Sequence, residues 1–399
     1  MIPLPVDAAR GLGRLETDAE EVTGVQIDSR RVRPGDLFVA IRGGPVYLDD
    51  ARANGATATL VPDDDFAALA AIGRAVRERV TVPVVAITGS VGKTSTKDIL
   101  TALLRQRANV VAAEDGFNNE IGLPLTLCRV EADTDVVVTE MGMRGAGQIR
   151  ALAEIARPRI GVITSIGPAH LEMLGSIENV ARAKAELLDF VEVAVLPENA
   201  PVLEPFVPAG LDVRRFGAPD VEIRNGHAIV NGVEFSFGAR HQAENAAAAL
   251  ATLEALGYPP PDGPVEVQFS RWRSQERELP GGGLLINDAW NANPVAMRAA
   301  LEHLQERADG RRTVAILGDM AELGPDAPSY HEEIGRAAGT VAVVIGVGEL
   351  ARGYDPDAWA PTAAEAVAVA REIVRPGDAV LVKGSRSVGL EIVAEALGE

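Results

Sequence analysis

A glycine-rich turn within residues 84–104, VVAITGSVGKTSTKDILTALL, combines a lysine with several hydroxyl side chains. An apolar run precedes the turn and a helical pattern follows it, so backbone N–H groups and a helix N-terminus would face one point. In such a loop Lys93 would reach the terminal phosphates of a nucleotide, and the Thr94 hydroxyl would coordinate Mg²⁺. An ordinary strand-to-helix turn is the simpler alternative, but a lysine at this place favours phosphate binding. We therefore predict a phosphate-binding loop formed by Gly89, Ser90, Val91, Gly92, Lys93, Thr94 and Ser95.

Lysine is rare in this chain. Of 38 Lys and Arg residues only four are lysine, at positions 93, 97, 184 and 383. Arginine stays protonated, whereas lysine offers a compact ammonium group or an amine that can lose its proton. Chance and a general preference for arginine are the alternative explanation. We predict functional roles for Lys93, Lys184 and Lys383, and an ordinary helical position for Lys97.

Two candidate metal ligands follow the phosphate loop. Glu140 closes the buried run VVVTE, at the strand end where α/β sheets place their ligands, and His170 lies in the loop after the next strand. A carboxylate and an imidazole at one edge could bind Mg²⁺, although histidine is an unusual ligand for so hard an ion. Each residue alone would be interpreted as structural. Beside a phosphate loop we favour the metal site.

A third candidate is Lys184, within the predicted helix SIENVARAKAELLDFV that Ser176 would cap. The simpler interpretation is that Lys184 extends outward along its methylene groups. The alternative is a desolvated lysine with a lowered pKa. A neutral amine can add carbon dioxide to form a carbamate able to hold a second Mg²⁺, which arginine could not do. The apolar stripe around Lys184 consists of Ile177, Val180, Leu187, Leu188 and Val191.

The elements that position these residues indicate an α/β fold with three domains. Residues 1–80 contain short strands in VTGVQI, DLFVAI and ATATLV and a helix near 66–79. A linker at 80–83 leads into the second domain, residues 81–265. This domain contains the parallel-type strands VVAIT, VVVTE and RIGVIT. Residues 266–399 alternate the strands LLIND, TVAILGD, VAVVIG and AVLVKGS with helices.

A small antiparallel patch interrupts the central pattern. The segment VEIRNGHAIVNGVEFSF at 221–237 contains two Asn-Gly pairs between alternating runs, a strong hairpin signal. An Ala-rich helix at 241–256 follows and would end at Gly257, before several prolines.

Composition excludes several classes of protein. A net charge of −19 argues against a nucleic-acid-binding surface. The start MIPLPVDAAR lacks the features of a signal peptide, and no apolar run is long enough to span a bilayer. Cys128 is the sole cysteine, so no intrachain disulfide can form, and we expect it to be a small buried hydrophobe. We expect a cytoplasmic protein that acts as a monomer.

Several motifs together resemble the Mur ligases of peptidoglycan synthesis. These are TGSVGKTST, the strand ending at Glu140 and the segment from His170 to Lys184. The resemblance implies three domains: an N-terminal domain for a UDP-linked sugar, a central ATPase-like domain, and a Rossmann-like C-terminal domain that closes over the nucleotide. Further segments are similar to the branch that adds D-alanyl-D-alanine: DSRRVRPGDLFVAIRG, FNNEIGLPLTL, NDAWNANPVAM, LGDMAELG and LVKGSR.

The resemblance implies an ADP-forming ligase that activates the carboxylate of a UDP-muramyl peptide as an acyl phosphate and joins it to D-alanyl-D-alanine. It implies two Mg²⁺ ions bound by Thr94, Glu140, His170 and a carbamylated Lys184. Asn245 would contact adenine, Arg273 the phosphates and Asp288 the nucleotide. The implied substrate residues are Asp28, Ser29 and Arg30 in the first domain, Asn118 and Asn119 in the second, and Asn291, Asn293, Lys383, Ser385 and Arg386 in the third.

The chain also departs from the family pattern. GPVYLDDA follows Gly43 where the family has a Gly-His segment, and separately the two residues between Gly89 and Gly92 depart from the four of the general phosphate-loop pattern. Trp290 replaces a usual tyrosine, and Trp272 stands where glycine is common. The alternatives that we weigh are a folylpolyglutamate-type ligase, a Mur ligase that adds another residue, and a non-catalytic nucleotide-binding module. The N-terminal domain at residues 1–80 argues against the folylpolyglutamate type, because that type lacks an N-terminal domain of this kind.

Overall fold

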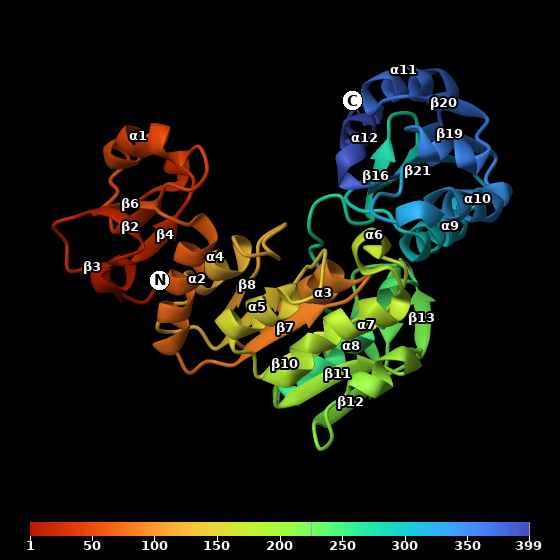
Figure 1. The fold of residues 1–399 in the computed structure, drawn as a ribbon. Helices are drawn as coiled ribbons and strands as arrows, with labels where there is room; N and C mark the ends of the chain where they lie inside the picture. The colour runs from red at the N-terminus through yellow and green to blue at the C-terminus, as the bar shows by residue number, and fades with distance from the viewer. Residues whose placement is uncertain (225, 399) are drawn as a thin grey trace.

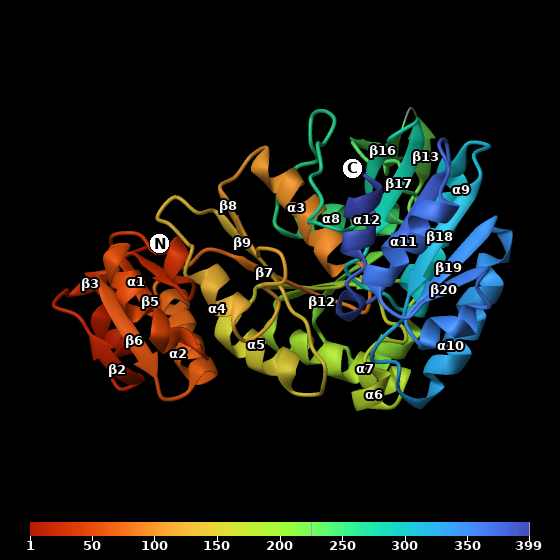
Figure 2. The ribbon, with the colours of Figure 1, turned by 90° about the horizontal axis from the view of Figure 1, so that it is seen from above.

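The computed structural model describes residues 1–224 and 226–398 as three lobes, each built on its own β-sheet. Figures 1 and 2 place the N-terminal lobe at one end of the molecule, the C-terminal lobe at the other and the central lobe between them. The α/β fold class predicted from the sequence is confirmed.

The N-terminal lobe is a four-stranded sheet with two helices. Its elements are β1 (Leu4–Pro5), β2 (Gly13–Glu16), β3 (Glu21–Val22), β4 (Gly24–Gln26), β5 (Asp36–Val39), α1 (Leu48–Ala53), β6 (Ala58–Pro62) and α2 (Asp65–Glu78). The strand order is β2-β6-β5-β4, and Asp64 caps α2 by accepting from two backbone N–H groups. The core of this lobe includes Leu125 and Cys128 of the central lobe, so the two lobes share buried apolar contacts.

The central lobe is built on six parallel strands in the order β12-β11-β10-β7-β9-β8. Its elements are β7 (Val84–Thr88), α3 (Lys93–Arg105), β8 (Val110–Ala112), α4 (Gly122–Leu127), β9 (Val136–Glu140), α5 (Gln148–Ala156), β10 (Ile160–Ile163), α6 (Leu171–Leu174), α7 (Ile177–Ala185), β11 (Val193–Pro197), β12 (Asp212–Phe216) and α8 (Gln242–Ala255). Strand β7 buries both faces: Val85 and Ile87 pack with α3 and α8, whereas Val84 and Ala86 pack with α5 and α7.

The predicted antiparallel patch is confirmed. Strands β13 (Val221–Arg224), β14 (His227–Val230) and β15 (Val233–Phe235) form a three-stranded sheet. Asn231 and Gly232 connect β14 to β15 with φ values of 49° and 82°, as a two-residue hairpin turn with positive φ at both positions requires. Asn225, in the other predicted turn, lies outside the described residues.

The C-terminal lobe has a six-stranded sheet in the order β16-β17-β21-β18-β19-β20. Its elements are β16 (Gln275–Leu279), β17 (Gly283–Asp288), α9 (Pro294–Ala308), β18 (Thr313–Gly318), α10 (Ala327–Ala337), β19 (Val343–Val347), β20 (Ala358–Ala360), α11 (Ala363–Ile373), β21 (Ala379–Lys383) and α12 (Glu391–Leu397). Helices α9 and α10 pack on one face, and α11 and α12 on the other. The edge strand β16 is antiparallel to β17 and was not among the predicted strands, since its sequence QEREL is mostly polar.

One predicted helix is shorter than expected. Ser176 caps α7 through the N–H of Asn179, as predicted, but the α-helix ends at Ala185 and a 3₁₀ turn covers 186–190. Ile177 has 39% of its surface exposed and Val191 lies beyond the helix, so neither belongs to a buried helical stripe. The tighter turn changes the direction of the side chains, while Lys184 itself is buried.

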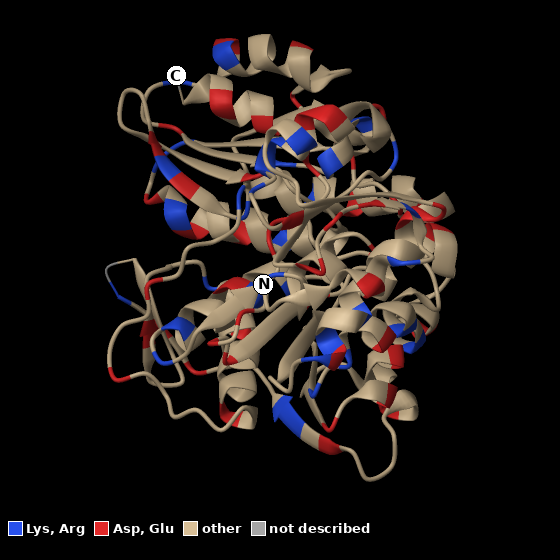
Figure 3. Cartoon of the chain, turned by 90° about the vertical axis from the view of Figure 1, so that its left-hand side faces the viewer, with Lys and Arg blue, Asp and Glu red and all other residues tan. Residues whose placement is uncertain are grey.

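Charge and burial elsewhere agree with the composition. Acidic residues occur on elements throughout the chain in Figure 3, as a net charge of −19 requires. Cys128 is buried as predicted, and burial raises the pKa of its thiol to about 12. Within the described residues, no helix is both long enough and apolar enough to cross a membrane.

Candidate active site

The phosphate loop connects β7 to α3 and requires two of its glycines. A Cβ atom at Gly89 would lie 2.0 Å from Thr164 Oγ1, and one at Gly92 would lie 2.1 Å from Asn245 Oδ1. Gly92 also has a φ of 88° and directly precedes α3. Because only glycine fits both the conformation and the space, the neighbouring elements can pack closely around the loop.

The free donors of this loop face a cavity of about 530 Å³. The first part of the loop is fixed, because the Ser90 N–H donates to Ser165 O and the Val91 N–H donates to Ser165 Oγ, each at 2.9 Å. No side chain caps the N-terminus of α3. The N–H groups of its first turn therefore suit an anion, and residues 90–95 line the cavity.

Lys93 is folded back onto its own loop. Its Nζ donates to Gly89 O at 2.8 Å. Burial and the nearby positive charge of Arg273 lower the pKa of Lys93, and the Glu140 carboxylate opposes that shift. A phosphate group in the cavity would offer this ammonium group a charged partner in place of a neutral carbonyl.

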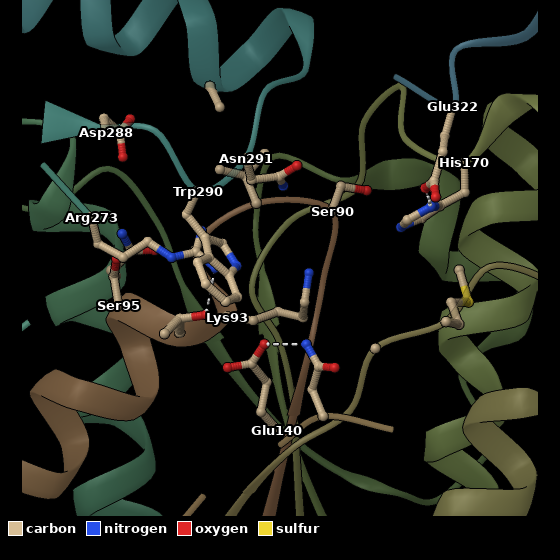
Figure 4. A pocket seen from close by; sticks show the side chains of 18 of the residues that line it. Ser90, Lys93, Ser95, Glu140, His170, Arg273, Asp288, Trp290, Asn291 and Glu322 are labelled. Atoms are coloured by element: carbon tan, nitrogen blue, oxygen red, sulfur yellow. Dashed lines mark hydrogen bonds and ion pairs between the residues drawn. The ribbon is translucent and has the colours of Figure 1, made fainter. Parts of the chain in front are cut away.

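Thr94 and Glu140 present oxygen atoms to the same cavity. Glu140 is only 5% exposed, and Asn118 Nδ2 donates to its Oε1 at 3.0 Å (Figure 4). Among the described residues, no three His, Cys, Asp or Glu side chains are grouped as a metal site. The donors present fit Mg²⁺ nevertheless, because this ion keeps several waters and uses phosphate oxygens beside one or two protein oxygens.

His170 lies at the rim of the cavity and contacts the C-terminal lobe. Its Nδ1 is 2.5 Å from Glu322 Oε2, a contact visible in Figure 4. The structure thus brings Thr94, Glu140 and His170 to one cavity, but His170 is also held by a carboxylate from another lobe.

Lys184 lies behind the cavity rather than on its lining. It is 1% exposed, and its Nζ has no hydrogen bond or ion pair with any described residue. Burial, followed by the positive charge of Lys93, places the pKa of Lys184 well below its ordinary value. An unpaired, buried and readily deprotonated amine is chemically suited to carbamate formation.

The C-terminal lobe contributes a second wall. Arg273 Nη2 donates to Thr94 Oγ1 at 3.1 Å, across the boundary between the lobes. Lys383 Nζ donates to Asp288 Oδ2 at 2.5 Å and to Asn291 O at 2.8 Å. Lys383 is buried, and this pairing fixes the end of β21 against the end of β17. The cavity is lined on this side by four residues of the C-terminal lobe, Arg273, Asp288, Asn291 and Lys383.

The linker into the C-terminal lobe is anchored to α3 by Lys97. Its Nζ lies 3.0 Å from Asp98 Oδ1 and 3.4 Å from Ser270 Oγ, and the Ser270 N–H donates to Asp98 Oδ2. Lys97 thus occupies a helical position within α3, as expected, and there it is a buried anchor for the linker. Beyond this anchor, Trp272 and Ser274 have φ values of 57° and 49°, which marks the place where the chain turns between the lobes.

Asn245, the residue expected near adenine, lines the cavity with its amide engaged by neighbours. Its Oδ1 accepts from Thr96 Oγ1 at 3.3 Å, and its Nδ2 donates to Gln242 Oε1 at 2.7 Å. Asn118, Asn119 and Asn291 also line the cavity, as expected of substrate residues.

Three predicted substrate residues of the C-terminal lobe do not line it. Asn293 caps α9 by accepting from the Ala296 N–H, and Ser385 Oγ accepts from the Ala321 N–H. Arg386 pairs with Glu391 and lies over the Trp272 ring, 4.7 Å from its centre. In this arrangement the three residues support the cavity wall from behind.

The predicted residues of the first lobe lie apart from this cavity. Asp28 accepts from the Arg30 guanidinium, which lowers the pKa of the carboxyl group to about 2. Ser29 is buried, and Arg30 lines a separate groove between the N-terminal and central lobes. The N-terminal lobe instead reaches the cavity through Arg42.

Sequence reasoning missed several lining residues. Glu322 belongs to the quoted motif LGDMAELG and Arg144 follows the quoted strand VVVTE, but neither stood out as a site residue. Trp290 was noted only as a departure from the family pattern and His241 only as the start of a predicted helix, although both line the cavity. The remaining missed residues are Arg42, Glu120, Gly142, Met143, Gln148, Gln242, Ser274, Ala296 and Ala299.

Comparison with known proteins supports the family resemblance for most of the chain. Residues 87–253 match the family model of the Mur ligase middle domain, and residues 272–386 match the Mur ligase glutamate ligase domain. A UDP-N-acetylmuramoyl-tripeptide--D-alanyl-D-alanine ligase of Synechocystis is 32% identical, over 95% of this chain and 92% of the relative.

Solved structures agree along nearly the whole length. MurF of Acinetobacter baumannii matches with a TM-score of 0.83 and 25% identity, covering 99% of this chain and 98% of that one. MurF ligase of Thermotoga maritima in complex with ADP matches with a TM-score of 0.81 and 27% identity, covering 94% and 97%. With a phosphate loop, a buried carboxylate and an arginine from another lobe meeting in one cleft, these similarities establish that the chain belongs to the Mur ligase family.

Proposed function

We propose that this protein joins D-alanyl-D-alanine to a UDP-N-acetylmuramoyl tripeptide, with ATP converted to ADP and phosphate, in the synthesis of peptidoglycan precursors. The relatives with that printed name and the cleft between the lobes support the proposal. The observation that carries it is the contact of Arg273 with Thr94, because it places groups from two lobes around one phosphate loop.

The first step is activation of the acceptor acid. A carboxylate oxygen of the tripeptide attacks the γ-phosphorus of ATP, ADP leaves, and an acyl phosphate forms. Lys93, the first turn of α3 and Arg273 would surround the transferring group with positive charge and N–H donors. Thr94 and Glu140 would hold Mg²⁺, which supplies further neutralisation of the phosphate charge, with His170 and a carbamylated Lys184 as the other proposed ligands.

The second step forms the amide bond. The neutral amine of D-alanyl-D-alanine attacks the acyl carbon, the C–O bond to phosphate breaks, and the amine nitrogen loses its proton. No enzyme nucleophile is required, because orientation and charge stabilisation supply the rate. We propose that the amine enters beside Asn291, whose lobe also carries Arg273, so that closure of the C-terminal lobe completes the site.

Further properties belong to the same proposal. We propose that the domains span 1–80, 81–265 and 266–399, that Asp28, Ser29 and Arg30 serve the UDP-substrate, and that the protein acts in the cytoplasm as a monomer. Asn293, Ser385 and Arg386 would act by shaping the cleft from behind its wall.

Phosphate release tests the function. We expect release only when ATP, a UDP-muramyl tripeptide and D-alanyl-D-alanine are all present, with a mass increase of the nucleotide-linked peptide equal to one dipeptide residue. Replacing the dipeptide by single amino acids tests a ligase of different specificity. Phosphate release that is indifferent to both substrates would instead indicate a P-loop switch that hydrolyses ATP without ligation.

A further inference from the structure

Glu322 of the C-terminal lobe contacts cavity residues of the central lobe through both of its carboxylate oxygens. Oε2 lies 2.5 Å from His170 Nδ1, and Oε1 lies 3.4 Å from Arg144 Nε. The Glu322 carbonyl also accepts from the Glu172 N–H at 3.4 Å. One residue therefore makes three contacts across the lobe boundary, at the rim of the proposed active site.

The two partners at the centre of this contact share an uncommon backbone conformation. His170 has a φ of 56° and Glu322 a φ of 62°. For residues other than glycine this left-handed conformation is unfavourable, and it persists where the surrounding structure imposes it. Two such residues in direct contact indicate that both loops are held in a defined arrangement for this pairing.

The loop that carries Glu322 is fixed to its own lobe. The Met320 N–H donates to His331 Nε2 and the Ala321 N–H donates to Ser385 Oγ, each at 2.9 Å, and both acceptor residues are buried. The loop also approaches the central lobe closely, because a Cβ atom at Gly324 would lie 3.2 Å from Glu172 Cα. Glu322 thus moves with the C-terminal lobe as a rigid projection.

We propose that Glu322 is a latch and a positioning residue, which couples closure of the C-terminal lobe to the orientation of His170. When the lobe closes, the Glu322 carboxylate accepts a hydrogen bond from the Nδ1–H of the His170 imidazole. The ring is then oriented with Nε2 toward the cavity. Arg144 forms an ion pair with the other carboxylate oxygen of Glu322, so the same closure also fixes the position of the Arg144 guanidinium at the rim of the cavity. Without Glu322 the ring can rotate, and the lobes lose a charged contact.

The kinetic test rests on the proposed function. In Glu322→Gln we expect kcat for ligation to fall at least tenfold and KM for D-alanyl-D-alanine to rise about fivefold, while the dissociation constant for ATP changes less than twofold. Glu322→Asp should recover part of kcat, because it restores the charge at a shorter reach. The control is Glu349→Gln, which removes an exposed glutamate that pairs with Arg352 within the same lobe. A kcat within twofold of the unmodified protein in Glu322→Gln would overturn the proposal.

A second measurement needs no ligase activity. Small-angle X-ray scattering of the full chain with a non-hydrolysable ATP analogue should show a smaller radius of gyration for the unmodified protein and for Glu349→Gln, and a smaller decrease for Glu322→Gln. Equal compaction of all three proteins would overturn the latch. If the unmodified protein ligates no dipeptide but the compaction differs as expected, the proposed function fails and the latch stands.

Discussion

Arg273 donates a hydrogen bond to the hydroxyl of Thr94, so the C-terminal lobe contacts the phosphate loop directly. Burial lowers the pKa of this arginine, whereas several nearby carboxylates raise it. Its charge is thus placed in a partly buried position between the lobes, where it is worth more to a developing phosphate charge than it would be in bulk water.

Arg273→Ala should therefore lower kcat roughly 100-fold, the size expected for loss of one aligned donor. Arg273→Lys should retain part of that rate, since an ammonium keeps the charge but loses the planar fork. The control is Arg271→Ala on the same linker, whose side chain does not line the cavity and which should stay within twofold. Steady-state phosphate release measures all three, and equal rates for the two alanine variants would contradict the assignment.

Lys184→Arg should abolish most of the activity, because arginine cannot form a carbamate. The unmodified protein should also lose activity in buffer freed of carbon dioxide and regain it on addition of bicarbonate. Independent of activity, ¹³C-labelled bicarbonate should give a carbamate carbon resonance that Lys184→Arg lacks. Full activity of the arginine variant, or a resonance that persists in it, would exclude the carbamate.

Motion of the C-terminal lobe can be tested by locking it. A Cβ atom at Gly167 would lie 3.3 Å from Val295 Cγ2, so these positions adjoin across the boundary between the central and C-terminal lobes. Disulfides need Cβ atoms roughly 3.5–4.5 Å apart, and the sole native cysteine, Cys128, is buried. The double variant Gly167→Cys, Val295→Cys should lose turnover on oxidation and recover on reduction, whereas each single variant should not respond. Full turnover of the oxidised protein would show that opening is unnecessary.

The sequence predicted the local elements well, because their signals are local. The run VVAIT, the Ser176 cap and the Asn231-Gly232 turn each appear as expected. Contacts between lobes were not predictable in the same way. Nothing in LGDMAELG shows that Glu322 meets His170, since 152 residues separate them. The contact of Lys97 with Ser270 was not predictable for the same reason, because Ser270 belongs to a distant linker.

The histidine pair at the lobe boundary gives a pH prediction. The rings of His241, before α8, and His303, on α9, lie edge to face at 5.3 Å, and Nδ1 of each is buried without a partner. Burial and then the neighbouring His303 lower the pKa of His241 from 6.5 to about 4, with Lys383 acting in the same sense and Asp288 and Glu276 opposing. Between these pH values the unfolded chain binds more protons than the folded one, so stability falls as pH falls from about 6.5 to 4, by roughly 3 kcal/mol at most.

Glu276 contributes to the stability of the fold in a different pH range. It contacts His303 Nε2 at 2.8 Å and Arg307, and although burial opposes them, these partners lower its pKa from 4.5 to about 2. Its contribution is therefore present above pH 4.5 and is lost only as the pH falls toward 2. Loss of stability between pH 6.5 and 4.5 then comes from the histidines, and His331, whose pKa burial also lowers, contributes beside His241. In denaturant titrations, His241→Gln should reduce the slope of that part of the profile, whereas His227→Gln, which removes a half-exposed histidine paired with Glu234, should leave it unchanged. A profile of equal slope in both variants would refute the role of His241.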